Sequence, residues 1–105
     1  MSTYLDEDAV AIRSALEPDV NPPPESDHLF VLYAVLMRAK GQYVTASDVH
    51  DAWAAWMQLK SPEHEALKPF EELESGVQQE DDAYVEAIRT TARVRAAAKG
   101  GRREQ

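Results

Sequence analysis

The sequence has no cysteine, only four glycines and no long apolar run. The missing cysteines exclude disulfide bonds, thiolate zinc sites and a cysteine nucleophile. No glycine-rich phosphate loop, H-E-x-x-H helix or nucleophile elbow occurs, so the best-known nucleotide, zinc-protease and serine-hydrolase motifs are missing. The longest apolar run, LFVLYAVLM over residues 29–37, is shorter than the roughly 20 residues that cross a bilayer. We therefore expect a protein without a membrane span.

Positive charge is scarce over most of the chain. Residues 1–88 contain 18 acidic and 5 basic side chains, whereas residues 89–105 contain 6 basic and 1 acidic, and the whole chain carries a net charge of −8. An acidic body repels phosphate backbones, so we expect no nucleic-acid groove there. The basic end predicts solubility, a nucleic-acid contact (against which the acidic body argues), or docking onto an acidic partner. That partner could be another copy's acidic body, so a homodimer is a secondary expectation.

What is present indicates one small globular domain. The chain has 105 residues, of which 44% are hydrophobic, enough for a real but modest core. The first ten residues, MSTYLDEDAV, lack the basic start and apolar stretch of a signal peptide, so we expect a cytoplasmic protein. We place the helical domain at residues 1–98 and a flexible basic tail at 99–105.

Apolar spacing predicts an all-α bundle of four main helices. The first begins after a Thr3 cap and ends before Pro18, and the second covers about 28–40, capped by Ser26 or Asp27 and closed by Gly41. The third begins with the Thr45–Asp48 capping box and runs to about 60. The last begins near Asp81, after an irregular proline-containing loop in which the segment FEELES forms one turn stopped at Gly76.

The two tryptophans carry the main question of function. Trp53 and Trp56 lie three residues apart on the third predicted helix, so both can enter one seam between helices. Core packing is the simplest interpretation, because tryptophan dominates a small core. We expect Pro69 and Phe70 to pack against one indole. The alternative is a shelf for a flat ligand or for a side chain of a partner.

The other polar candidates predict little chemistry. His50 and His64 lie on different segments and complete no helical ligand pair, so we expect no metal site. The carboxylates over residues 71–82 resemble a solvated face rather than an acid–base pair. No nucleophile with a neighbouring base is recognisable. We therefore expect no catalytic residue and no cofactor.

Residues 45–90 resemble the ryanodine-receptor repeat domain, which also occurs in short bacterial and phage proteins. A His-Asp-Ala-Trp helix at 50–53 carries the resemblance, together with His64, Leu67, Pro69 and Phe70 in an H-x-x-L-x-P-F pattern. A Glu-Leu pair at 72–73 and an acidic helix start at 81–82 complete it. The connector MQLKSPE is shorter than the glycine- and tryptophan-containing segment usual in that family. The whole chain also resembles small proteins of actinobacteria and their phages, a likeness that implies no known activity.

These observations lead to two hypotheses of function. The first is a non-enzymatic protein-interaction or host-modulating factor, which binds through the rim of the tryptophan helix and the segment HEALKPFEEL. The second is an adenine-nucleotide-binding module, as the resemblance to ryanodine-receptor repeats implies. That module would need a pocket walled by Trp53, Tyr43 or Phe70, with a basic side chain nearby for phosphates. The candidate residues are Trp53, Trp56, His50, His64, Pro69, Phe70 and Tyr43.

Overall fold

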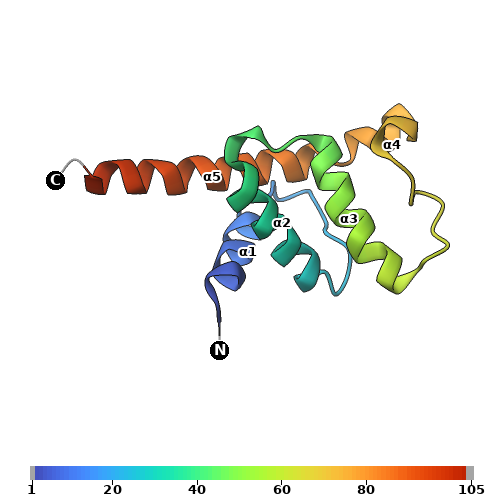
Figure 1. Ribbon diagram of the computed structural model, residues 1–105, viewed down its shortest axis with the longest axis horizontal. Helices are drawn as coiled ribbons and strands as arrows, with labels where there is room; N and C mark the ends of the chain where they lie inside the picture. The colour runs from blue at the N-terminus through green and yellow to red at the C-terminus, as the bar shows by residue number, and fades with distance from the viewer. Residues whose placement is uncertain (1, 104–105) are drawn as a thin grey trace.

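The computed structural model describes the backbone of residues 2–103 and the side chains of residues 2–98. Within this part there are five α-helices, two short 3₁₀ helices and no strand, so the expected all-α class is confirmed (Figure 1). The elements are α1 (Tyr4–Ser14), α2 (Asp27–Lys40), η1 (Gly41–Tyr43), α3 (Ala46–Lys60), η2 (Phe70–Glu72), α4 (Ser75–Gln79) and α5 (Asp82–Arg103). The four expected main helices are α1, α2, α3 and α5. No helix in the described part is long and apolar enough to cross a membrane.

Helix α2 is the centre of the bundle. It packs against α1, α3 and α5, which explains why its sequence is apolar on nearly every face. Its buried side chains are Leu29, Phe30, Tyr33, Ala34 and Met37. In the core they are joined by Ile12, Val49 and Ile88 from the other helices.

Local capping sets the starts of α1 and α3. The hydroxyl of Thr3 accepts a hydrogen bond from the Asp6 amide at 3.2 Å, and the Asp6 carboxylate accepts from the Thr3 amide at 3.0 Å. Thr45 and Asp48 form the same reciprocal pair at 3.2 and 2.9 Å. Both caps therefore satisfy amides that the first turn leaves without a helical partner, as the sequence predicts.

Helix α2 begins and ends with different chemistry. Ser26 occupies the N-cap position but makes no side-chain cap. Its buried hydroxyl instead accepts a hydrogen bond from Nη2 of Arg13 at 3.2 Å, which links α1 to the start of α2. At the other end Gly41 has φ of 57°, a left-handed conformation that favours glycine and stops the helix as expected.

Gly76 does not stop a turn, contrary to the sequence-based expectation. The segment after Pro69 forms η2 and then α4, and Gly76 lies inside α4. The side-chain amide of Gln78 donates a hydrogen bond to the Phe70 carbonyl at 2.9 Å and ties the two short helices together. The chain therefore turns twice before it enters α5.

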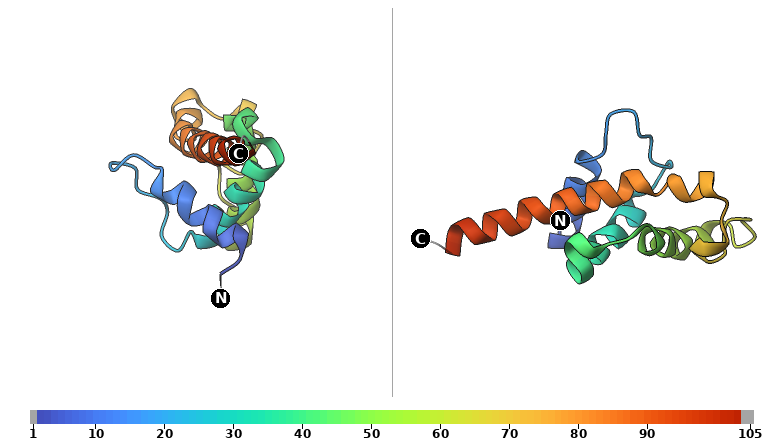
Figure 2. Two further views of the ribbon diagram at one scale, coloured as in Figure 1. Left: turned by 90° about the vertical axis from the view of Figure 1, so that its left-hand side faces the viewer. Right: turned by 90° about the horizontal axis from the view of Figure 1, so that it is seen from above.

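Helix α5 crosses the bundle and continues past it (Figures 1 and 2). Arg89 on this helix donates two hydrogen bonds, at 2.9 and 2.7 Å, to the Val44 carbonyl that follows η1. Arg95, one turn and a half further on, donates to the buried carboxylate of Asp8 in α1 at 2.7 Å. The side chains of the expected flexible tail, residues 99–105, lie outside the described part of the structure.

Candidate binding pocket

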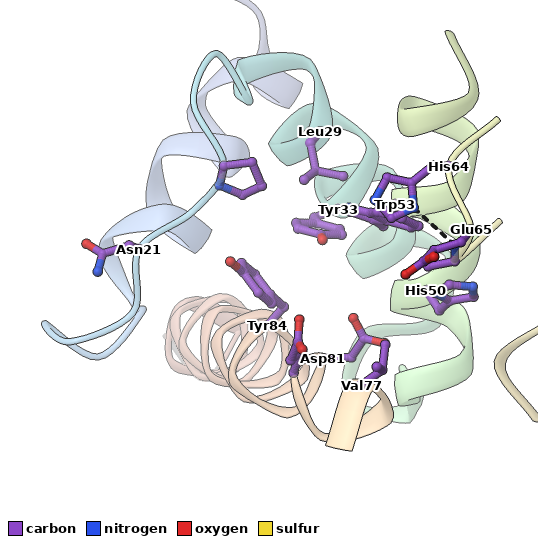
Figure 3. Close-up of a pocket in the computed structure, with 13 residues that line it drawn as sticks. Asn21, Leu29, Tyr33, His50, Trp53, His64, Glu65, Val77, Asp81 and Tyr84 are labelled. Atoms are coloured by element: carbon purple, nitrogen blue, oxygen red, sulfur yellow. Dashed lines mark hydrogen bonds between the residues drawn. The ribbon is translucent and has the colours of Figure 1, made fainter. Parts of the chain in front are cut away.

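A pocket of about 390 Å³ opens where α3, the start of α5, the proline-rich connector after α1 and the loop after α3 meet (Figure 3). We call it the Trp53 pocket. It is lined by Asn21, Pro23, Leu29, Tyr33, His50, Trp53, His64, Glu65, Ala66, Val77, Glu80, Asp81 and Tyr84. Its volume falls at the lower end of the range of ligand sites, about 300–1,000 Å³.

One wall of the pocket is built around the half-buried indole of Trp53. The His50 ring stacks on it, with centroids 5.5 Å apart and planes at 25°. The His64 ring meets it edge-on, at 5.1 Å and 83°. The indole is thus contacted by both imidazoles, and it still borders the pocket.

The two histidines also hold the loop that follows α3. His50 is buried, and its Nε2 donates a hydrogen bond to the Lys68 carbonyl at 2.7 Å. The Nδ1 atom of His64 accepts a hydrogen bond from the Ala66 amide at 3.0 Å. Each imidazole therefore uses one nitrogen to fix backbone, which gives the His-Trp and H-x-x-L-x-P-F patterns a structural role.

The opposite wall is acidic. Asp81, just before α5, is half-buried in the pocket and forms no ion pair with any side chain that the structure describes. The pKa of Asp81 is raised to about 6, mainly by burial; His50 opposes this rise, and the negative charges of Glu80 and Asp82 add to it. Asp81 is therefore mostly ionised at neutral pH, although its surroundings disfavour the charge.

Two tyrosines lie between these walls (Figure 3). The rings of Tyr33 and Tyr84 are 5.6 Å apart and tilted by 41°. Burial raises the pKa of both hydroxyls, and the negative charge of Asp81 raises it further. Both tyrosines are therefore neutral hydrogen-bonding groups in a negative environment.

The two tryptophans differ in their surroundings: Trp56 packs in the core, and Trp53 borders the pocket. Trp56 is only 6% exposed and belongs to the core, and the Lys60 ammonium lies 4.4 Å from its ring centroid. Trp53 borders the pocket instead. The ring neighbours of Trp53 are the two imidazoles, and Phe70 lies 6.3 Å from His50 rather than on an indole.

The other expected site residues do not line this pocket. Tyr43 is 84% exposed on η1, and the described lining includes neither Phe70 nor the exposed Pro69. Of the three side chains that the sequence suggested as walls of a nucleotide pocket, Trp53 borders this pocket, and Tyr43 and Phe70 do not. Only Trp53, His50 and His64 of the candidates meet there.

Sequence reasoning named only three of the thirteen lining residues as candidates. Tyr33 sits in the middle of an apolar run and looks like core, and Tyr84 lies on the apolar side of the last helix. Glu80 and Asp81 look like ordinary charges at a helix start. The signal that could have found them is the pairing of two acidic residues with a tyrosine one turn later, but that signal is weak without the fold.

The lining limits what the pocket can do chemically. Asp81 has a pKa close enough to neutrality to transfer a proton. The described lining contains no serine, threonine, cysteine or lysine to act as a nucleophile. Among the described residues no three His, Cys, Asp or Glu side chains are grouped to hold a metal ion.

Asp81→Asn should raise stability at neutral pH. The folded chain keeps the Asp81 proton up to about pH 6, whereas an ordinary aspartate releases it near 3.8. The stability of the wild type therefore falls as the pH rises through this window, and asparagine escapes the loss. Thermal unfolding should show a higher Tm for the variant at about pH 7.5 and equal Tm values at about pH 3.5. A lower Tm for the variant at neutral pH would contradict this.

These features define a small all-α domain with an open pocket of aromatic and acidic side chains. The chain belongs to the family described as Domain of unknown function (DUF7701), whose model matches residues 3–93. No curated protein and no solved structure matches the chain.

Proposed function

We propose that the chain is a non-enzymatic protein-interaction or host-modulating factor of a phage or an actinobacterium, which acts in the cytoplasm by binding a partner protein. The observation that carries the proposal is the open Trp53 pocket, bordered by α3 and the loop after it. Trp53 and residues 64–66 of the segment HEALKPFEEL, which are part of the suggested binding surface, line this pocket, whereas Trp56 does not. The proposed origin rests on the resemblance to small actinobacterial and phage proteins.

The composition of the pocket supports a protein partner. Tryptophan and tyrosine are enriched among the residues that dominate binding energy at protein interfaces. The Trp53 indole is held in place by two imidazoles, so little conformational freedom is lost when a partner contacts it. Val77, which is 38% exposed, extends the apolar lining to the surface.

An adenine-nucleotide-binding module is the alternative that the resemblance to ryanodine-receptor repeats suggests. The indole could stack on a base, but no arginine or lysine is among the described residues of the lining, and three carboxyl groups are. Those carboxylates would repel phosphates. The pocket therefore favours a protein partner over a nucleotide.

A pull-down with matched variants tests the proposal. Tagged full-length chain is incubated with host and phage-infected lysate beside Trp53→Ala and Leu59→Ala, and retained proteins are quantified by mass spectrometry. Leu59 is on the same helix and is 85% exposed, but the pocket lining does not include it. A partner should be retained by wild type and Leu59→Ala and fall about tenfold or more with Trp53→Ala.

Equal retention by all three chains would reject the pocket as the interaction surface, provided that circular dichroism shows all three folded. A second copy of the chain is among the proposed partners because its acidic and basic residues are segregated along the sequence. Light scattering decides that point, since a purely monomeric protein at low salt rules out the homodimer.

A further inference from the structure

Three aromatic side chains of the Trp53 pocket lack a cation. Elsewhere in the described structure, cations of the chain cover aromatic faces: the arginine or lysine lies 4.4–4.5 Å from the ring centroid in the pairs Arg13–Phe30, Arg38–Tyr4 and Lys60–Trp56. No such pair within the described residues includes Tyr33, Trp53 or Tyr84. Aromatic rings attract cations through their negative faces. The pocket therefore offers the same kind of surface without an occupant.

Carboxyl groups surround this aromatic surface. Glu65 comes from the loop after α3, and Glu80 and Asp81 come from the turn before α5, so the charges enter from two sides. No arginine or lysine is found among the described lining residues. The pocket thus combines aromatic rings with a strong excess of negative charge.

Tyr33 is an unpaired polar group aimed into the pocket. Tyr33 is only 1% exposed, and its hydroxyl makes no hydrogen bond with any described residue. Every fully buried polar side-chain atom in the described part has a hydrogen-bond partner. Because the Tyr33 hydroxyl has none, it is not fully buried. The small exposed part of Tyr33 therefore includes its oxygen, which opens into the pocket that the residue lines. A ligand with N–H donors would satisfy this oxygen and the Asp81 carboxylate together.

We propose that the Trp53 pocket binds the cationic end of a lysine or arginine side chain presented by the partner protein. This inference rests on the proposed function, whose partner it describes chemically. The ammonium or guanidinium group lies against the faces of Trp53 and Tyr84 and donates to Asp81 and to the Tyr33 hydroxyl. The apolar stem of the side chain passes Leu29, Pro23 and Val77 on its way to the surface.

Two peptide pairs test the chemistry directly. Each is an acetylated, amidated glycine-rich peptide with one central residue: arginine against citrulline, and lysine against norleucine. Citrulline and norleucine keep the length of the side chain and remove its charge. Binding is followed by the indole N–H signals of ¹⁵N-labelled full-length chain, assigned with Trp53→Phe. The Trp53 signal should shift saturably, and the Trp56 signal, which belongs to the core, should stay in place.

The expected result is binding at least about tenfold tighter for each charged peptide than for its neutral counterpart. Asp81→Asn should weaken binding of the charged peptides by about ten- to a hundredfold, because it removes a charge-assisted hydrogen bond. Asp82→Asn is the matched control, since Asp82 is the next residue, is exposed and is absent from the lining. Its effect should be within about threefold of wild type. Asp81→Asn is the variant expected to be more stable, so misfolding would not explain its loss of binding.

The inference would be overturned by no shift of Trp53 with either charged peptide, by equal affinity for the neutral peptides, or by an equal effect of Asp82→Asn and Asp81→Asn. Tighter binding of ADP than of the charged peptides would overturn it as well. Cadaverine, a free diamine, separates the two sources of an ammonium group. Cadaverine binding more tightly than the lysine peptide would overturn the assignment to a protein side chain. The pull-down tests the proposed function independently of the peptides. If retention of a partner does not depend on Trp53, the proposed function is wrong. If retention depends on Trp53 but the charged peptides do not bind, only the inference about the cation is wrong.

Discussion

Replacing both Arg38 and Arg95 with methionine should lower the free energy of unfolding by about 3–5 kcal/mol. Asp8 in α1 is 2% exposed, and its two carboxylate oxygens accept short hydrogen bonds, at 2.6 Å from Arg38 Nε and 2.7 Å from Arg95 Nη1. The double variant leaves this carboxylate buried without a cation. An uncompensated buried charge is among the largest single destabilising effects known in folded proteins.

The single variants separate pairing from packing. Each single change leaves one guanidinium on Asp8, so each should cost about 1.5–3 kcal/mol. In an Asp8→Leu background the two arginine changes should cost little, because no buried charge remains. Unfolding in urea measures all the free energies. Arg93→Met is the control on the same helix, because within the described residues the Arg93 side chain bonds only to the Thr90 hydroxyl, at 3.2 Å. Equal costs of the double change in both backgrounds would show that the carboxylate is not the cause.

This junction matters for the pocket because it fixes α5. Asp8 joins α1 to α2 through Arg38 and to α5 through Arg95. Arg89 also ties α5 to the Val44 carbonyl. The start of α5, where Asp81 and Tyr84 lie, is thereby held against α2 and Tyr33. The ion pairs therefore place the acidic wall of the pocket opposite its aromatic wall.

Local features of the fold could be predicted from the sequence. The capping boxes at Thr3 and Thr45 depend on residues three positions apart, and the stop at Gly41 depends on one residue. The apolar spacing of α2 reflects its three neighbouring helices. Each of these features is encoded within a turn or two of helix, so a short pattern contains all the necessary information. The bounds of α2 and α3 and the starts of α1 and α5 agree with expectation to within one residue, whereas α5 continues to Arg103, into the segment expected to be a tail.

The pocket could not be predicted in the same way because its contacts join distant residues. His50 in the lining meets the carbonyl of Lys68, 18 positions away, and the ion pair that holds α5 joins Asp8 to Arg95 across 87 positions. The pairing of Asp81 with Tyr33 in one hollow depends on how α5 crosses α2. No spacing in the sequence records that crossing. In the sequence Glu80 and Asp81 look like ordinary charges at a helix start, and only the fold places them in one pocket with the Trp53 indole.

Trp56→Ala should lower the free energy of unfolding by about 3–5 kcal/mol, and Trp53→Ala should lower it by about 1–2 kcal/mol. Two side chains three residues apart on a helix point in directions about 60° apart around its axis. Here this difference is enough to bury the indole of Trp56 and to leave that of Trp53 at the pocket. Loss of Trp56 opens a cavity in the core. Loss of Trp53 removes a partly solvated wall of the pocket and its ring contacts with His50 and His64.

Trp56→Ala should therefore have the larger effect on the free energy of unfolding, and Trp53→Ala the larger effect on binding affinity. Urea unfolding gives the stability of each variant, and titration with the arginine peptide gives its affinity, followed by backbone amide signals of the residues around Asp81. Trp53→Ala should weaken binding by about tenfold or more while the chain stays folded. Trp56→Ala, measured at a temperature where it is still folded, should keep its affinity within about threefold. Equal losses of stability, or equal losses of affinity, would mean that both indoles belong to one core and that the pocket has no separate role.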